Sequence, residues 1–365
     1  MRIVISGGGT GGHLFPALAV QAMLVRRHPE ARVLFVGSAG GVEATILSGL
    51  GLAFRGLPVR QIKGKGWGAQ AAAALALPSA VSQAARLLRE FEAQAVLGVG
   101  GYASFPTVLA ARLSGRPAVI HEQNAYPGLA NRWLGRLASW VAISFEEAAR
   151  FFPSGRVAVT GNPVRAEIRP GDAGEARRAL GLGPARFTLL VFGGSQGAHR
   201  INLAVAEALP VLTERRSEIQ FLHASGERDL AEVRQAYQRT AFESRVEAFF
   251  REMGTAYAAA DFVIARAGAS TIFELAALGK PALLIPYPYA ANDHQRLNAE
   301  AVVRVGGAWT IPDRVCDGRR VAASVQAALE KPEVLRRMGE QVRTLARPDA
   351  AERIVALLER VVGGA

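Results

Sequence analysis

A histidine that directly follows a glycine-rich turn is the residue in this chain best suited to do chemistry. The turn has the sequence GGGTGGH, in which Gly7, Gly9 and Gly12 allow the backbone to turn tightly and approach a phosphate. His13 stands where a helix should begin, and the helix dipole there disfavours its charged form. A neutral imidazole facing a cleft is suited to act as a base. Tight packing of a strand on a helix with nothing bound, or a capping histidine, explains the same residues without chemistry.

Two further stretches offer groups that could bind a phosphorylated ligand. In VFGGSQGAHRIN, Ser195 lies in a second glycine-rich turn, either as a phosphate ligand or as a plain helix N-cap. In ARAGASTIFE, Arg266 precedes a predicted helix N-terminus and would favour a diphosphate. Thr271 and Glu274 have the spacing of a capping box, and Glu274 could also accept hydrogen bonds from ribose hydroxyls. The two interpretations of Glu274 can hold together.

Polar side chains also follow several of the predicted strands. Because ligands bind at the carboxyl ends of the strands in open α/β sheets, we expect the polar groups that follow strands of the first half to converge near His13. The second half supplies a comparable set in ANDHQRLNA. The residues are Tyr102, Glu122, Gln123 and Asn124 in the first half, and Asp293, His294, Gln295 and Asn298 in the second.

Several common catalytic and cofactor sites do not match the residues present. A dinucleotide site would carry an acid at the end of the second strand, but ARVLFVG ends in Gly37 and is followed by Ser38. A P-loop would need Gly-Lys-Ser/Thr, and Gly12 is followed by His13. The sequence contains no D-x-D triplet and no His/Cys/Asp group with metal-ligand spacing. We therefore expect no nicotinamide cofactor and no bound metal.

The elements that must position these groups form an alternating pattern. Continuous apolar strands separated by Ala- and Leu-rich helices indicate parallel sheets with both faces covered. The pattern starts again near Phe187, so we predict two doubly wound domains with a boundary in GNPVRAEIRPGDAGEARRALGLGPA. Periodicity does not decide whether the helix after Pro348 stays on the second domain or crosses back to the first. The predicted strands are RIVIS, RVLFVG, AVLGVG, PAVIHE, SWVAIS and RVAVTG, then FTLLVFG, IQFLHASG, RVEAFF, FVIARAG and PALLIPYP.

Composition and charge narrow the class of protein. The 365 residues are 50% hydrophobic, and the single cysteine, Cys316, rules out a disulfide framework and fits a reducing compartment. No signal peptide is evident, and GAQAAAALALPSAV is too short to span a bilayer and is broken by Pro78, so we expect a soluble, cytoplasmic protein. The formal net charge of +12 would suit nucleic acid, an anionic membrane face or phosphorylated substrates, or reflect a general preference for arginine.

The motifs together resemble the MurG family of bacterial peptidoglycan synthesis. GGTGGH, GGY, HEQN, GNPVR, GGSQGA, RAGAST…E and DHQ…NA follow one another in the order and spacing of that family, from about residue 3 to about residue 300. The resemblance implies the GT-B glycosyltransferase fold, with two Rossmann-like domains facing a cleft, at 1–161 and 162–340, and a last helix, 341–365, that returns to the N-terminal domain. It implies inverting transfer of GlcNAc from UDP-GlcNAc to the C4 hydroxyl of MurNAc in lipid I, which gives lipid II.

The resemblance also assigns expected roles to individual residues. His13 is the expected base, with Glu122 and Tyr102 as helpers, and the leaving diphosphate needs amides and arginines but no metal or other cofactor. Phe250 stands where the family commonly has an aliphatic residue whose backbone contacts uracil, so its side-chain packing is open. The expected donor contacts are Thr10, Gly11, Gly12 and Asn124; Arg165, Ser195 and Arg266 at the diphosphate; Ala269, Ser270, Thr271 and Glu274 around the nucleotide, with Glu274 on the ribose; and Gln295 at the GlcNAc hydroxyls.

A lipid acceptor implies contact with the cytoplasmic side of the bacterial cell membrane, as a peripheral protein. The stretch RQIKGKGWG supplies a basic rim before small apolar residues, which suits an anionic membrane surface, whereas the alternative is an ordinary loop followed by a buried helix. We predict a membrane patch made of Arg60, Lys63, Lys65 and Trp67.

Three other functions are weighed against this one. A UDP-GlcNAc 2-epimerase shares the fold and the donor but needs no lipid. A dinucleotide oxidoreductase lacks its ribose-binding acid. A nucleic-acid-binding protein is supported only by the net charge of +12, and the stacking aromatics and motifs that it needs are absent from the sequence, so we expect no nucleic-acid partner.

Overall fold

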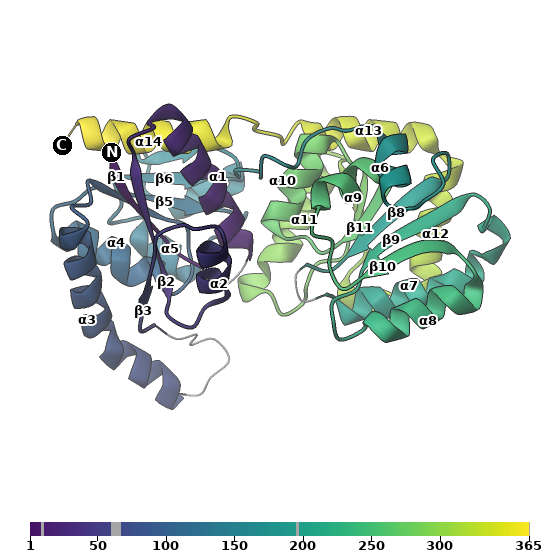
Figure 1. Cartoon of the computed structure of the whole chain (residues 1–365), viewed down its shortest axis with the longest axis horizontal. Coiled ribbons are helices and arrows are strands. Elements are labelled where there is room, and N and C mark those ends of the chain that lie inside the picture. Colours follow the sequence, from purple (N-terminus) through teal and green to yellow (C-terminus); the bar gives the residue numbers. More distant parts are fainter. Residues whose placement is uncertain (9–10, 60–66, 195–196, 365) are drawn as a thin grey trace. The chain divides into compact units, whose positions relative to one another are not determined.

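The chain folds as two units, each built on its own parallel sheet (Figure 1). The computed structural model describes residues 1–8, 11–59, 67–194 and 197–364. Unit 1 consists of Met1–Arg165 together with Arg347–Ala365, and unit 2 consists of Ala166–Ala346. The sequence-based division placed the boundaries slightly earlier, after residues 161 and 340.

Unit 1 contains a seven-stranded parallel sheet in the order β3-β2-β1-β4-β5-β6-β7. The chain extends from β1 to one side through β2 and β3, then crosses to the other side through β4, which is the order of a Rossmann sheet. Every residue of β4 and β5 is buried, as expected for strands covered on both faces. The strands are β1 (Arg2–Ser6), β2 (Arg32–Ser38), β3 (Phe54–Leu57), β4 (Ala95–Gly98), β5 (Ala118–Glu122), β6 (Trp140–Ile143) and β7 (Val157–Val159).

Helices connect these strands on both faces of the sheet, as right-handed crossovers between parallel strands require. Pro78 lies inside α3, so the expectation that it breaks this segment is wrong. Pro78 is exposed there, where water can bind the carbonyl that the missing N–H leaves without a partner. The helices of unit 1 are α1 (Gly11–Arg27), α2 (Val42–Gly49), α3 (Trp67–Glu90), α4 (Ser104–Leu113), α5 (Leu129–Leu134), the 3₁₀ helix η1 (Glu146–Phe151) and α14 (Ala350–Gly363).

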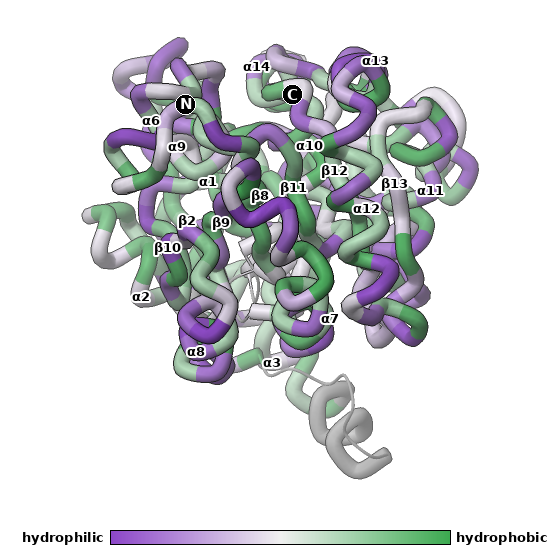
Figure 2. The backbone as a smooth tube through the Cα atoms, turned by 90° about the vertical axis from the view of Figure 1, so that its right-hand side faces the viewer, coloured by the Kyte–Doolittle hydropathy of each residue, from purple (hydrophilic) through white to green (hydrophobic). Residues whose placement is uncertain are grey.

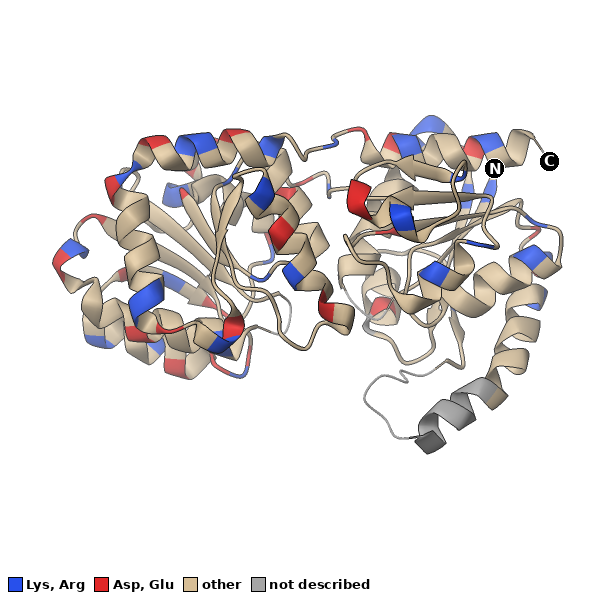
Figure 3. Cartoon of the chain, turned by 180° about the vertical axis from the view of Figure 1, so that it is seen from behind, with Lys and Arg blue, Asp and Glu red and all other residues tan. Residues whose placement is uncertain are grey.

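The last helix of the chain, α14, packs on the sheet of unit 1 beside α1 (Figure 1). Ile354, Val355 and Leu358 of α14 are fully buried in one core cluster with Ile3 and Ile5 of β1. The preceding helix, α13 (Pro332–Arg343), belongs to unit 2 instead. Acidic and basic residues alternate along the outer surfaces of both helices (Figure 3), with ion pairs such as that of Arg353 with Asp349, the N-cap of α14.

Unit 2 repeats the architecture with a six-stranded parallel sheet in the order β10-β9-β8-β11-β12-β13. Numbered from its own first strand, this is the same order as the first six strands of unit 1, so the predicted restart near Phe187 is confirmed. The strands are β8 (Phe187–Phe192), β9 (Ile219–Ala224), β10 (Glu243–Glu247), β11 (Phe262–Ala265), β12 (Ala282–Leu284) and β13 (Ala308–Thr310). The α-helices are α6 (Ala173–Ala179), α7 (His199–Val211), α8 (Leu230–Thr240), α9 (Met253–Ala259), α10 (Ala269–Leu278), α11 (His294–Arg304), α12 (Gly318–Glu330) and α13, and the 3₁₀ helices are η2 (Thr213–Arg215), η3 (Ala291–Asp293) and η4 (Asp313–Val315).

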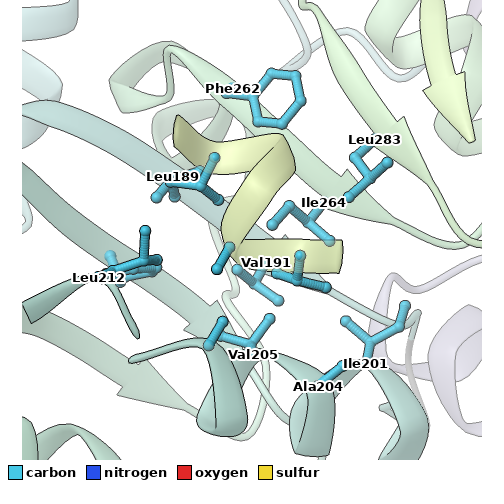
Figure 4. Close-up of a cluster of buried hydrophobic side chains, with 14 of the residues drawn as sticks. Leu189, Val191, Ile201, Ala204, Val205, Leu212, Phe262, Ile264 and Leu283 are labelled. Atoms are coloured by element: carbon cyan, nitrogen blue, oxygen red, sulfur yellow. The ribbon is translucent and has the colours of Figure 1, made fainter. Parts of the chain in front are cut away.

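Apolar side chains from β8 and β11 form the core of unit 2 together with those of α7. Leu189, Val191 and Ile264 are fully buried and lie against Ile201 and Val205 of α7 (Figure 4). Figure 2 shows the same distribution along the backbone, with hydrophobic residues on the central strands and hydrophilic ones on the outer helices. A rigid core of this kind fixes the strand ends from which the functional loops start.

All eleven predicted strands are confirmed, and two more are present, β3 and β13, both at sheet edges. Across the described ranges, no helix combines the length and the hydropathy that crossing a bilayer requires.

Candidate active site

The glycine-rich turns of unit 1 pack backbone to backbone where β1 and β4 end. A Cβ at Gly101 would lie 2.4 Å from the carbonyl oxygen of Gly8, and its φ of +85° is in the region that favours glycine. A Cβ at Gly7 would likewise lie 2.4 Å from the carbonyl oxygen of Gly100. This close approach occurs where the chain switches from one side of the sheet to the other, which is where open α/β sheets bind ligands.

His13 lies in the first turn of α1 and contacts both glycine-rich turns. Its Nδ1 is 3.2 Å from the carbonyl oxygen of Gly8. Because a carbonyl can only accept, this hydrogen bond requires the proton on Nδ1 and leaves the lone pair on Nε2. Nε2 lies against the turn after β4, since a Cβ at Gly100 would be 2.9 Å from it. The ring is partly buried, and its orientation suits a proton acceptor at Nε2.

Glu122 ends β5 and is only 2% exposed. Its carboxylate accepts four hydrogen bonds, from the backbone N–H groups of Asn124 (2.9 Å) and Gly128 (3.1 Å) and from the side-chain amides of Asn124 (3.2 Å) and Asn131 (2.9 Å). Burial raises the pKa of this carboxyl, and the four hydrogen bonds act in the opposite direction. The arrangement fits an anchor for the loop that carries Asn124.

The loop after β5 is also tied to the turn after β4. The Gln123 side chain is buried and donates to the carbonyl oxygen of Val99 at 2.9 Å. Tyr102 follows Gly101 in the same turn and is half-buried. The loops that carry His13, Tyr102 and Asn124 therefore follow β1, β4 and β5, three strands that lie next to one another in the sheet.

Arg165, the last residue of the first part of unit 1, stacks on the beginning of α1. Its guanidinium lies 4.4 Å from the centre of the Phe15 ring, a cation–π contact. Gly11 starts this helix and packs against the same ring, since a Cβ there would lie 3.0 Å from Phe15. Gly12 follows and is exposed. A cation and a helix N-terminus thus come together near His13, a combination that favours an anion.

In unit 2, the turn after β8 packs against the turn after β9. A Cβ at Gly197 would lie 2.1 Å from the carbonyl oxygen of Ser225, and the φ of Gly197 is +72°. Asn202 of α7 donates to the same carbonyl oxygen at 2.8 Å. The two turns are therefore held as one layer at the carboxyl edge of the sheet.

Glu274 has a different partner from the one that the capping-box spacing suggests. The helix α10 begins at Ala269 with Gly268 as its N-cap and no side-chain cap, so the capping-box interpretation of Thr271 and Glu274 is wrong. Glu274 lies in the second turn of α10, is 6% exposed and accepts a hydrogen bond of 2.9 Å from the hydroxyl of Tyr257. Ala269 is buried, and Ser270 and Thr271 are half-buried at the start of the helix.

Arg266 makes several contacts within unit 2. It pairs with the carboxylate of Asp313, and its guanidinium also donates to the carbonyl oxygens of Ile285 (3.1 Å) and Pro286 (3.3 Å). The guanidinium lies 5.5 Å from the centre of the Tyr287 ring. These contacts fix the loop after β12, so binding of a diphosphate by Arg266 would compete with them.

The other predicted donor contacts of unit 2 are Gln295 and Phe250. Gln295 is in the first turn of α11 and accepts from the backbone N–H of Tyr287 at 2.9 Å. Asn292 and Asp293 just before it have φ values of 52° and 55°, the left-handed conformation that is uncommon for residues other than glycine. Phe250 follows β10 with its side chain buried at 8% exposure.

Some of the predicted residues lie outside the described part of the chain. They are Thr10 in the first turn, Ser195 in the turn after β8, and Arg60, Lys63 and Lys65 of the membrane patch. Trp67 begins α3, but its side chain is also outside the description.

One buried acid near the site was missed at the sequence level. Glu43, in the first turn of α2, is 3% exposed and accepts from the backbone N–H of Ser38 at 3.0 Å. A Cβ at Gly8 would lie 2.4 Å from the Glu43 carboxylate, so Glu43 packs directly against the first glycine-rich turn. The only signal in the sequence was an acidic residue two positions after the glycine pair Gly40 and Gly41, beyond the second strand. Among the residues described, His, Cys, Asp and Glu form no group of three or more that could hold a metal.

Comparisons with known proteins identify the family. The glycosyltransferase family 28 N-terminal domain matches residues 3–143, and the C-terminal domain of the same family matches residues 188–354. A relative from Citrifermentans bemidjiense named UDP-N-acetylglucosamine–N-acetylmuramyl-(pentapeptide) pyrophosphoryl-undecaprenol N-acetylglucosamine transferase is 46% identical over 98% of this chain and 99% of its own length. A relative of the same name from Thermodesulfovibrio yellowstonii is 39% identical over 99% of both chains.

Solved structures agree with this assignment at the level of the fold. The crystal structure of Acinetobacter baumannii MurG matches with a TM-score of 0.78 and 28% identity, over 98% of this chain and 99% of that one. The UDP-GlcNAc 2-epimerase from Neisseria meningitidis, bound to UDP-GlcNAc, matches with a TM-score of 0.69 over 99% and 100% of the two chains. It is only 15% identical, so this likeness concerns the fold alone.

Proposed function

The chain belongs to the MurG group of glycosyltransferase family 28 and has its GT-B fold, and we propose that it transfers GlcNAc from UDP-GlcNAc to the C4 hydroxyl of MurNAc in lipid I. Identity of 46% along nearly the whole chain to a transferase of that name is the observation that carries the proposal. The product is lipid II, with the new β-1,4 bond formed by inversion.

His13 supplies the base for this reaction. The C4 oxygen of the acceptor attacks C1 of GlcNAc, its proton passes to Nε2 of His13, and the bond from C1 to the UDP oxygen breaks. The contact of Nδ1 with the Gly8 carbonyl supports this role because it holds the ring with the lone pair on Nε2. The imidazolium that forms is stabilised by the same carbonyl dipole.

The remaining unit 1 residues position the reaction. Glu122 acts as a positioning residue, because its four hydrogen bonds fix the loop that brings Asn124 to the donor. Tyr102 assists from the turn that packs against His13. Arg165 approaches the donor diphosphate while Phe15 holds its guanidinium. A hydrogen bond from arginine to a charged oxygen stabilises it by roughly 1.5–3 kcal/mol.

Unit 2 is proposed to hold the nucleotide. The residues from Ala269 to Glu274 frame it at the N-terminus of α10, with Ser195 at the diphosphate and the backbone of Phe250 at uracil. Gln295 holds the GlcNAc hydroxyls, and the hydrogen bond from Tyr287 to its Oε1 orients the amide for this purpose. Helix N-terminal amides stabilise the charge that develops on the leaving UDP, and Arg266 contributes to the same end.

The lipid acceptor implies a peripheral position on the cytoplasmic side of the cell membrane. The patch of Arg60, Lys63, Lys65 and Trp67 is proposed to meet an anionic surface, where each basic residue contributes about 1 kcal/mol. Leu75 lies on α3, the helix that begins at Trp67, and its side chain is 83% exposed, which supports an apolar contact of α3 with the membrane. Salt should release the protein from anionic vesicles in a flotation assay, and binding that high salt leaves unchanged would contradict an electrostatic anchor.

Labelled UDP-GlcNAc tests the function directly when it is incubated with a short-chain lipid I analogue and, separately, without it. Label should enter the lipid only when the acceptor is present. Replacement of His13 by Ala should then lower kcat by about 10²- to 10⁴-fold. Isomerisation of the label without acceptor would instead favour an epimerase, and near-normal turnover of the variant would refute the assignment of the base.

A further inference from the structure

Tyr257 and Glu274 form a buried hydrogen-bonded pair inside unit 2. The hydroxyl of Tyr257, on α9, donates to Oε2 of Glu274, on α10, at 2.9 Å. Tyr257 is completely buried, and Glu274 is 6% exposed. A carboxylate in such a place is costly unless hydrogen bonds compensate for its lost hydration, so its purpose needs an explanation.

Capping of α10 does not provide that explanation, because the N-cap is Gly268 and its helix has no side-chain cap. Bonds from Cα to Cβ in a helix tilt toward its N-terminus, so the Glu274 carboxylate is carried back toward the turn that contains Ser270 and Thr271. That turn is the part of α10 proposed above to frame the nucleotide. The carboxylate is thus directed toward the ligand end of its own helix.

The tyrosine itself is held rigidly. Its ring meets the ring of Phe192 edge to face, with 5.8 Å between the centres and 88° between the planes. Phe192 is the last residue of β8, directly before the glycine-rich turn that begins at Gly193. The phenol hydroxyl therefore has a fixed position relative to the carboxyl edge of the sheet.

We infer that Tyr257 is a positioning residue that orients the Glu274 carboxylate toward the ribose hydroxyls of a uridine nucleotide, and so sets the preference for ribonucleotides over deoxyribonucleotides. The inference rests on the proposed function, in which Glu274 meets the ribose. The terminal torsion of a glutamate is broad, so one oxygen must be held for the other to point in a defined direction. The hydrogen bond from the phenol to Oε2 fixes one carboxylate oxygen, and with it the direction from which the carboxylate accepts further hydrogen bonds.

Equilibrium binding of UDP and of 2′-deoxy-UDP, measured by calorimetry without acceptor, tests this inference. The wild type should prefer UDP by roughly ten- to a hundredfold, which is what a hydrogen bond to a charged group contributes. Tyr257→Phe should reduce this preference by about fivefold or more, mainly through weaker binding of UDP. Binding of 2′-deoxy-UDP should weaken less, because it keeps only the 3′-hydroxyl as a partner for the oriented carboxylate.

Tyr237→Phe is the matched control. Tyr237 is also a buried tyrosine of unit 2, 3% exposed, but its hydroxyl lies 3.1 Å from Nδ1 of His223 and not beside Glu274. This variant should lose stability without changing the preference for UDP. A general loosening of unit 2 would reduce the preference in both variants, and that result would overturn the inference.

Two further variants complete the test. Glu274→Gln should lose the preference on its own, and adding Tyr257→Phe to it should have no further effect, because the tyrosine acts through the carboxylate. Phe192→Leu leaves both hydrogen-bonding groups in place and frees the tyrosine ring, so it should reduce the preference by a smaller factor even if Tyr257→Phe does not fold.

The outcomes separate the two levels of the proposal. If UDP does not bind to the wild type, the proposed function fails together with this inference. If UDP binds and Tyr257→Phe keeps the full preference over 2′-deoxy-UDP, only the positioning role fails. Additive losses in the double variant would also refute it, since they would mean that Tyr257 acts independently of Glu274.

Discussion

Replacement of Gly100 by Ala should impair catalysis through the position of the His13 ring. The new methyl group would lie 2.9 Å from Nε2 and 3.0 Å from Cδ2 of His13, closer than the van der Waals radii allow. The backbone at Gly100 has a φ of +94°, which residues with a side chain rarely adopt. Either the imidazole or the glycine-rich turn has to move.

The size of the effect follows from these two contributions. A left-handed backbone costs roughly 1–2 kcal/mol for a residue with a Cβ, and a clash in a packed site costs about 1–3 kcal/mol. Both lower the free energy of unfolding. Movement of the ring also disturbs the 3.2 Å contact of Nδ1 with Gly8 and takes Nε2 from its place. The kcat should then fall by about 10²-fold or more, which approaches the decrease expected when a general base is removed.

Gly115→Ala controls for the backbone contribution. Gly115 follows α4 with a φ of +69°, and its Cβ would meet no atom of the described chain within 4 Å. Both variants should show lower thermal stability, but only Gly100→Ala should lose turnover with UDP-GlcNAc and a lipid I analogue. The kcat should change more than the KM for UDP-GlcNAc, because the proposed contacts to uracil and ribose lie in unit 2. Equal kcat values in the two variants would refute the idea that turnover depends on where this turn holds the His13 ring.

Three further predictions concern stability. Burial lowers the pKa of His121 to about 4 and that of His223 to about 3, so the folded protein resists the protons that the unfolded chain takes up below about pH 6.5. Urea denaturation should show that the free energy of unfolding falls as the pH drops below 6.5. In His223→Gln this slope should be smaller by up to about 1.4 kcal/mol per pH unit, and parallel profiles of the two proteins would contradict the prediction. The raised pKa of Glu122 changes the stability in the opposite direction, equally in both proteins. Glu122→Gln should lower the free energy of unfolding by roughly 2–4 kcal/mol at pH 7, measured in the same way. The reason is that the NH2 group of glutamine would face N–H groups that now donate to the carboxylate. Leu358→Ala should cost about 2–5 kcal/mol and speed hydrogen exchange in α14, because this leucine is fully buried on the sheet of unit 1.

The sequence predicted the buried strands of both sheets but missed an edge strand in each. Among the described strands, β3 pairs only with β2, and two of its four residues are exposed. β13 has three residues and pairs only with β12. A strand that is covered on both faces needs a continuous apolar run, which the sequence displays, whereas a short edge strand does not. Its existence depends on the neighbouring strand, and therefore on tertiary structure.

The candidate site shows the same division. The glycine-rich turns and the types of the polar residues were visible, because local turn chemistry dictates them. The hydrogen-bond and ion-pair partners of these polar residues were not visible in the sequence. The capping-box spacing of Glu274 suggested a local role, but its hydroxyl donor is Tyr257 on another helix, and the acid that Arg266 meets is Asp313, beyond two more strands. Contacts of this kind become visible only once the strands are placed side by side.

The two units share one strand order but pack their glycine-rich turns differently. In unit 1, the packed turns follow β1 and β4, so the switch point between these strands is filled by glycine backbone with His13 directly against it. In unit 2, the packed turns follow β8 and β9, on one side of the switch point between β8 and β11. The N-terminus of α10 follows β11, on the other side of this switch point. In the proposed function, the first arrangement supplies the histidine base and the second holds uracil and ribose, while Arg165 of unit 1 approaches the diphosphate. A glycine fingerprint at the start of the chain therefore does not by itself indicate a dinucleotide site there.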